Sequence, residues 1–196
     1  MERSRLWAAL TLFFVSLISF TPAARGQERS LDTHKSKLTV RVYKSGLFSA
    51  FAHDHEIAAP ILRGTAELSE HPSVKLEVDA GALRVVDANT SEKDRSEIQK
   101  TMLGPDVLDS ERFHEIVFQS TSAEQNGADR WVVHGNLMLH GQSQPVTVDV
   151  LRESGRFTGH VAIKQTNFGI QPVRVAGGTV RVKDEVRIEF DVQLAP

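Results

Sequence analysis

The residues of this sequence best suited to chemistry are the cluster His53-Asp54-His55. The residues around the cluster indicate a β-strand, and alternate side chains of a strand share one face. His53 and His55 therefore point the same way, together with Phe51 and Ile57. Two imidazoles on one face can hold a metal ion, meet a polar ligand group or bond to the backbone.

A metal site at this cluster needs a third ligand. Zinc takes at least three protein ligands, and His134 and His140 are the candidates. The sequence has no HExxH motif and no similarly spaced third ligand. We therefore favour histidines that meet a ligand in an apolar pocket with a few placed polar groups. The alternative is a metal-binding protein or a metal-dependent enzyme that uses His53 and His55.

The sequence gives little support for other kinds of catalytic site. The 196-residue chain has no cysteine, which removes thiolate nucleophiles, disulfides and cysteine-ligated metals. It also has no GxSxG motif to mark a nucleophilic serine. We expect no enzymatic activity and no cofactor. The net charge of −2 argues against a nucleic-acid partner.

Residues 1–26 predict a signal peptide for export. Two arginines precede an uncharged apolar run over 6–20, which is shorter than the roughly 20 residues of a transmembrane helix. Ala24 and Gly26 supply the small residues of a cleavage site. We expect residues 27–196 to form the mature domain, with no membrane span after signal removal. In a Gram-negative bacterium its location would be the periplasm.

The mature chain alternates apolar and polar residues with a period of two, which is typical of half-buried strands. About eight short antiparallel strands separated by turn residues favour a sandwich or a barrel, and a closed barrel of this size can enclose one small ligand. The predicted strand segments lie at 37–43, 48–57, 61–69, 73–80, 115–123, 131–140, 144–152 and 157–165, with a last one near 185–194.

One segment, Ser91 to Leu103, breaks this alternation and predicts a short helix. Ser91 and Asp94 resemble a capping box, Ile98 and Met102 form an apolar edge, and Gly104-Pro105 follows as a stop signal. Such a helix can plug one end of a barrel, lid it or simply cross over it.

Several segments, taken in order, carry a family resemblance. They are Leu31-Asp32 to Val42, Phe51-Ala-His-Asp-His-Glu-Ile57 with Arg63-Gly64, Glu92-Lys-Asp-Arg95 through Val107-Leu-Asp109, Phe113-His-Glu-Ile-Val-Phe-Gln-Ser120, Gly135-Asn-Leu-Met-Leu-His-Gly141 to Pro145-Val146, and Asn167-Phe-Gly169 with Val182-Lys-Asp-Glu-Val186. Together they cover about residues 31–194. The chain resembles the YceI-like family of exported lipocalin-like proteins.

The resemblance implies an all-β fold, an extended eight-stranded antiparallel lipocalin-like barrel with one short helix in a crossover. It also implies binding of a long isoprenoid chain, such as a polyprenyl phosphate or a quinone tail, rather than catalysis. Three departures concern the head-group end of the ligand. His114 stands where the family usually has proline, and the cluster His53-Asp54-His55 stands where it usually has a single histidine. The interval from Ile98 to Pro105 is also unusual for the family.

We expect the partner to be a small amphiphilic lipid, and the sequence is compatible with a homodimer. A third interpretation is a stress-response protein that sequesters other amphiphiles, such as antibiotics. We expect His53 and His55 at the polar end of the ligand. The expected chain-lining residues are Phe51, Ile57, Ile116, Phe118, Leu137 and Phe168.

Overall fold

The computed structural model describes residues 27–45, 54–175 and 180–196. The predicted signal peptide, Phe51 and His53 lie outside these residues. The strands are β1 (Glu28–Ser30), β2 (Lys37–Ser45), β3 (His55–Ala58), β4 (Ile61–Glu67), β5 (Ser73–Asp79), β6 (Arg84–Val85), β7 (Glu115–Gln125), β8 (Arg130–Leu139), β9 (Gln142–Glu153), β10 (Arg156–Lys164), β11 (Arg174–Val175) and β12 (Val180–Gln193). The helix is α1 (Glu92–Leu103), and short 3₁₀ turns cover Ala80–Ala82 and Gln165–Phe168.

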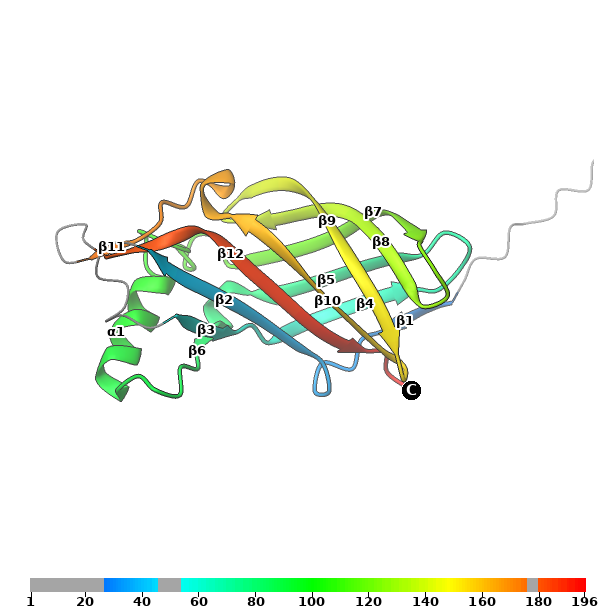
Figure 1. Ribbon diagram of the computed structural model, residues 1–196, viewed down its shortest axis with the longest axis horizontal. Helices are drawn as coiled ribbons and strands as arrows, with labels where there is room; N and C mark the ends of the chain where they lie inside the picture. The colour runs from blue at the N-terminus through cyan, green and yellow to red at the C-terminus, as the bar shows by residue number, and fades with distance from the viewer. Residues whose placement is uncertain (1–26, 46–53, 176–179) are drawn as a thin grey trace, which may run out of the picture.

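All the strand pairs are antiparallel, and the sheet curls around a long axis (Figure 1). β12 pairs with β10 on one edge and with β2 on the other, and β2 pairs with β3. β3 runs on through Ala59 and Pro60 into β4, which pairs with β5. From β5 the pairing continues through β7, β8 and β9 to β10. The pairing therefore runs from β12 through every neighbouring strand and back to β12, so the sheet closes on itself.

The described residues contain twelve strands. Three times, two successive short strands lie end to end and together cross the sheet once, as one long strand would, and we call each such crossing a pass. β1 pairs with β4 while β2 pairs with β3, so β1 and β2 lie along one edge of the same pass. β5 and β6 likewise follow the other edge, pairing with β4 and β3. Grouped in this way, and with the short β11 set aside, the strands make eight passes. The predicted all-β antiparallel barrel with one helix is confirmed, and the predicted count of eight corresponds to these passes rather than to the twelve separate strands.

The tight hairpins fall where turn residues predicted them. His140 and Gly141 join β8 to β9 with φ of 51° and 70°. Ser154 and Gly155 join β9 to β10 with φ of 49° and 79°. Two successive residues with positive φ are the signature of a type I′ turn, whose twist matches that of the flanking strands. Each turn fixes the register of its hairpin.

The two ends of the described chain meet at one end of the sheet, near the label C in Figure 1. Leu31 forms an isolated bridge with Leu194, and the N–H of Ala195 donates to the carbonyl of Ser30 at 2.8 Å. The Arg29 guanidinium also donates to the Ala195 carbonyl. β1 is thereby tied both to β4 and to the segment that follows β12.

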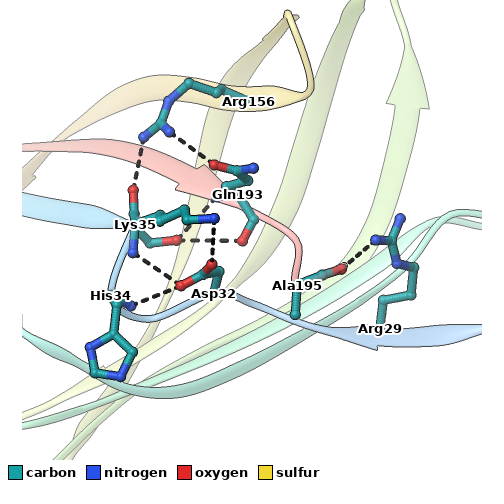
Figure 2. A network of polar contacts seen from close by, with 8 residues as sticks. Arg29, Asp32, His34, Lys35, Arg156, Gln193 and Ala195 are labelled. Carbon is teal, nitrogen blue, oxygen red and sulfur yellow. Dashed lines mark hydrogen bonds and ion pairs between the residues drawn. The ribbon is translucent and has the colours of Figure 1, made fainter.

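A polar network fixes the turn between β1 and β2 (Figure 2). Asp32 Oδ1 accepts the N–H groups of His34 and Lys35, each at 3.1 Å. From the β10 side, the Arg156 guanidinium donates to the Lys35 carbonyl at 2.9 Å and to Gln193 Oε1 at 3.2 Å. The network joins three neighbouring passes of the sheet at this end.

Helix α1 begins and ends as predicted. Ser91 Oγ accepts the N–H of Asp94 at 3.1 Å, and Gly104 is the C-cap residue. Met102 is buried, and Ile98 packs against the core. The helix lies at the end of the sheet opposite the label C, beside β3 and β6 (Figure 1).

Charged side chains cross the outer face of the sheet between β3, β2 and β12. The Arg41 guanidinium lies 3.0 Å from Glu56 Oε2 and 2.8 Å from Glu189 Oε2. The hydrogen bond from Arg41 lowers the pKa of Glu189 below its ordinary value of 4.5, and burial opposes this shift. Because the pKa of Glu189 is lower in the folded protein, the pair stabilises the fold above about pH 4.5.

We predict that Arg41→Met lowers the free energy of unfolding at pH 7 by about 1 kcal/mol or less, since both side chains are partly exposed. When the pH falls through the lowered pKa of Glu189, its carboxylate is protonated and the wild type loses the stabilisation that the ion pair with Arg41 provides. The difference in the free energy of unfolding between the two proteins should therefore shrink as the pH falls below 4.5 and through the lowered pKa of Glu189. Urea unfolding of both proteins at pH 7 and at pH 3.5 measures the difference in the free energy of unfolding at each pH. A larger difference at pH 3.5 would contradict a stabilising ion pair between Arg41 and Glu189.

Candidate binding cavity

The interior of the curled sheet is a cavity of about 640 Å³. Small-molecule sites in proteins usually measure about 300–1,000 Å³. The lining is mostly aliphatic and aromatic and comes from inward positions of most strands and from α1. On β2, for example, Leu38, Val40 and Val42 line the cavity, while the intervening Thr39 and Arg41 do not. The alternation read from the sequence therefore produces the apolar wall.

Most of the expected ligand-binding residues that the structure describes lie on this wall. His55, Ile57, Ile116, Phe118 and Leu137 line the cavity. Phe168 is placed differently, because it is 1% exposed, packs in the core cluster and does not belong to the lining. Contact of these residues with a ligand stays a prediction.

Two glycines keep aromatic rings against the wall. A Cβ atom at Gly135 on β8 would lie 2.6 Å from the ring of Phe118 and from the carbonyl oxygen of Gln119. At Gly159 on β10, a Cβ atom would lie 2.5 Å from the ring of Phe190. Both rings line the cavity. Each ring thus occupies the space that a side chain at the glycine would fill, which leaves the interior open.

One end of the cavity carries a paired histidine. Nδ1 of His55 lies 2.6 Å from Oδ2 of Asp87, whose side chain is 5% exposed. The other carboxylate oxygen of Asp87 accepts the N–H of Glu56 at 2.6 Å. Both oxygens are therefore engaged on β3, and the imidazole is fixed in orientation with Nε2 as its other polar atom.

The sequence pattern did not reveal Asp87 as a site residue. Asp87 follows β6 and meets His55 because Val85 pairs with Ile57 and the Val86 N–H donates to the Glu56 carbonyl. No spacing rule links an aspartate to a histidine 32 positions earlier. The signal is the burial of the carboxylate, which needs the fold.

The chemistry open to His55 depends on its protonation. A neutral ring that donates from Nδ1 to Asp87 presents Nε2 as an acceptor, whereas a protonated ring presents a second donor. A catalytic triad would add a nucleophile to such a pair. Within residues 27–45, 54–175 and 180–196, no serine or threonine hydroxyl bonds to His55. The described contact of His55 is therefore its pairing with Asp87, at the wall of the cavity.

The histidines considered as third metal ligands are engaged elsewhere. His134 Nδ1 lies 2.9 Å from Thr147 Oγ1, and His140 Nδ1 lies 3.1 Å from the Phe168 carbonyl. In the part of the chain that the structure describes, no group of three or more His, Asp or Glu residues could hold a metal ion.

Helix α1 is anchored over the same end of the cavity as His55. Oε1 of Gln99 accepts the N–H of Val85, and Nε2 of Gln99 donates to the carbonyl of Leu83, both at 2.8 Å. Ile98 and Met102 turn toward the cavity and line it. Of the three roles considered for the helix, the structure shows a cover over one end. No described helix has the length and apolar character needed to span a membrane.

We predict that Asp87→Ala lowers the free energy of unfolding by about 1–3 kcal/mol, because it leaves the Glu56 N–H and His55 Nδ1 unpaired. Asp87→Asn should lose less, since its amide can accept from Glu56 and donate to His55. Urea unfolding of both variants, beside the exposed-site control Asp106→Ala, measures the difference. Equal losses in the two Asp87 variants would show that the hydrogen bonds do not matter.

Curated proteins of other bacteria are similar to this chain in sequence. A protein of Vibrio cholerae serotype O1 (strain M66-2), named UPF0312 protein, is 29% identical over 128 residues, which cover 60% of this chain and 61% of the relative. A UPF0312 protein of Shewanella oneidensis is 27% identical over 139 residues, covering 66% of this chain and 65% of the relative. The chain thus spans less than two thirds of the length of these relatives.

A solved structure and a family model agree with the fold. The crystal structure of Burkholderia cenocepacia BcnA superposes with a TM-score of 0.65 at 20% identity, covering 85% of this chain and 99% of that one. A family model described as the YceI-like domain matches residues 30–194. That match takes in every described strand but β1, together with α1 and the whole cavity wall, and the chain therefore belongs to the YceI-like family.

Proposed function

We propose that this protein is a non-catalytic binding protein of the periplasm that holds a long isoprenoid or a similar amphiphilic lipid inside its curled sheet. The observation that carries the proposal is the open apolar cavity of about 640 Å³. A filled core would leave no space for a lipid chain, whereas an apolar cavity accepts one in place of water. The periplasmic location rests on the predicted signal peptide at residues 1–26.

The shape of the sheet favours a long ligand over a compact one. β12 has 14 residues, which at about 3.3 Å per residue extend roughly 46 Å. Barrel strands tilt by about 35–45°, so such a strand spans roughly 35 Å of the axis. Residues near both ends of β12, from Val182 to Val192, line the cavity. An extended hydrocarbon chain matches this geometry.

Burial of hydrocarbon supplies enough free energy for useful affinity. Each buried CH₂ group contributes about 0.8 kcal/mol, so ten such groups contribute about 8 kcal/mol. That value corresponds to a dissociation constant of about 1 μM before the cost of association is counted. A chain of fifteen or more carbons offsets part of that cost without any polar contact.

The direct test is organic extraction of the protein purified from its native periplasm, followed by mass spectrometry. We expect to recover an isoprenoid or another long-chain amphiphile in near-stoichiometric amount. Recovery of an antibiotic-like amphiphile would support the broader sequestering role. Recovery of no amphiphile, together with no uptake of geranylgeraniol, would overturn the proposal.

A matched pair of variants on β10 tests whether the cavity is the binding site. Val161 lines the cavity, and the adjacent Ala162 is exposed on the outer face. We predict that Val161→Trp weakens geranylgeraniol binding at least tenfold by filling the interior, while Ala162→Trp leaves it within about twofold. Displacement of a fluorescent fatty acid measures both affinities, and circular dichroism checks the fold. Equal affinities in the two variants would place the ligand outside the cavity.

A further inference from the structure

The apolar wall of the cavity reaches solvent at the end of the sheet opposite α1. There the lining follows β4 and β5 into the turn between them, from Ala66 to Leu68 and from Pro72 to Val74. Leu68 comes directly after β4 and is 47% exposed. Figure 1 shows the β4–β5 turn at the far end of the sheet from α1. We call this end of the cavity the Leu68 end.

Leu68 differs from the other exposed apolar side chains in its continuity with the interior. The described residues contain three large apolar side chains that are exposed, namely Leu62, Leu68 and Val86. Single exposed apolar residues are common on protein surfaces. Leu62 and Val86 do not belong to the cavity lining, whereas Leu68 does. An apolar contact in solvent is therefore joined to the apolar interior at this one residue.

Two aromatic rings continue the apolar surface inward from the same end. Trp131 is the second residue of β8 and Phe157 is the second residue of β10. Both rings line the cavity, and their centroids lie 6.3 Å apart. The β7–β8 and β9–β10 turns just before them lie at the end opposite α1 (Figure 1). The strands that reach the Leu68 end therefore keep an apolar inner face close to their tips.

The lining is different where it meets solvent at the α1 end. In the described parts of the chain, the exposed lining residues are Leu68, Ser73, Glu97, Thr101 and Arg181. The last three lie on α1 and at the start of β12, and all three are polar. The apolar lining residues of α1, Ile98 and Met102, are half-buried and buried. A hydrocarbon chain that approaches this end therefore meets polar groups first.

The side of the sheet offers no easier route. β8 and β9, for example, pair without interruption from Arg130 with Leu151 to Leu139 with Gln142. A lipid that passed between two such strands would break several backbone hydrogen bonds at once, and each broken bond costs free energy. Because the sheet is closed, the ends of the cavity remain as routes for a ligand.

We propose that the hydrocarbon chain of the ligand enters and leaves the cavity through the Leu68 end, with Leu68 as its first apolar contact. This inference rests on the proposed function. A chain that enters there passes from an exposed apolar side chain to half-buried and buried ones, so it loses contact with water at each step. Entry at the α1 end would begin against the charged groups of Glu97 and Arg181, and removing water from charged groups is costly.

The test uses the absence of cysteine from the chain. Leu68→Cys and Thr101→Cys each introduce a single thiol at an exposed lining residue, one at each end of the cavity. A maleimide joins biotin to each thiol, and bound streptavidin then covers that end. Stopped-flow fluorescence measures the association and dissociation rates of a fluorescent fatty acid with and without streptavidin.

We expect streptavidin on Leu68→Cys to slow both association and dissociation about tenfold or more. A blocked route slows both directions by the same factor, so the dissociation constant should stay within about twofold. Streptavidin on Thr101→Cys should change each rate by less than about twofold. Before labelling, both variants should exchange the fatty acid within about twofold of the wild-type rates.

The other outcomes overturn either the route or the proposed function. Slowing by streptavidin on Thr101→Cys alone would place the entrance at α1. Equal effects at the two ends, including no effect at either, would also overturn the Leu68 route. A weaker dissociation constant with an unchanged association rate in capped Leu68→Cys would show a damaged site rather than a blocked route. All of these results leave the proposed function standing. Failure of the unlabelled wild type to bind the fatty acid, together with an empty native extract, would overturn the proposed function itself.

Discussion

Closure of the antiparallel sheet is the constraint on which the rest of the molecule depends. β12 satisfies its backbone groups on both edges, against β10 and β2, and β3 carries the pairing on into β4. A closed sheet divides every strand into an inward and an outward face. In this protein the inward residues are mostly apolar, so closure of the sheet encloses an apolar interior.

Closure alone does not leave that interior empty. The wall of this protein is rich in valine, and two of its large rings, Phe118 and Phe190, lie over glycines of the neighbouring strands. Larger residues at Gly135 and Gly159 would push the rings inward. The open volume therefore depends on these small positions as much as on hydrophobicity. The same wall ends at Lys44, where the apolar series of β2 gives way to charge.

Much of the fold could be predicted from the sequence, because it is written in local patterns. Period-two alternation located the long strands, Ser91 and Gly104 marked the ends of α1, and turn pairs such as His140-Gly141 placed the hairpins. The union of β3 and β4 into one pass could not be predicted in this way. It depends on which partners each half finds, β2 and then β5, and those contacts are long-range.

The candidate site was predictable only in part for the same reason. The inward parity of Ile57, Ile116, Phe118 and Leu137 follows from local alternation, and these residues do line the cavity. Phe168 has no such pattern, because it lies in a 3₁₀ turn that packs into the core. Asp87 makes two hydrogen bonds to β3, and Gln99 makes two to Leu83 and Val85, and only the folded chain creates these contacts. Periodicity thus fixes which side chains face inward, while the close approach of rings, carboxylates and glycines decides what space and which charges the interior offers.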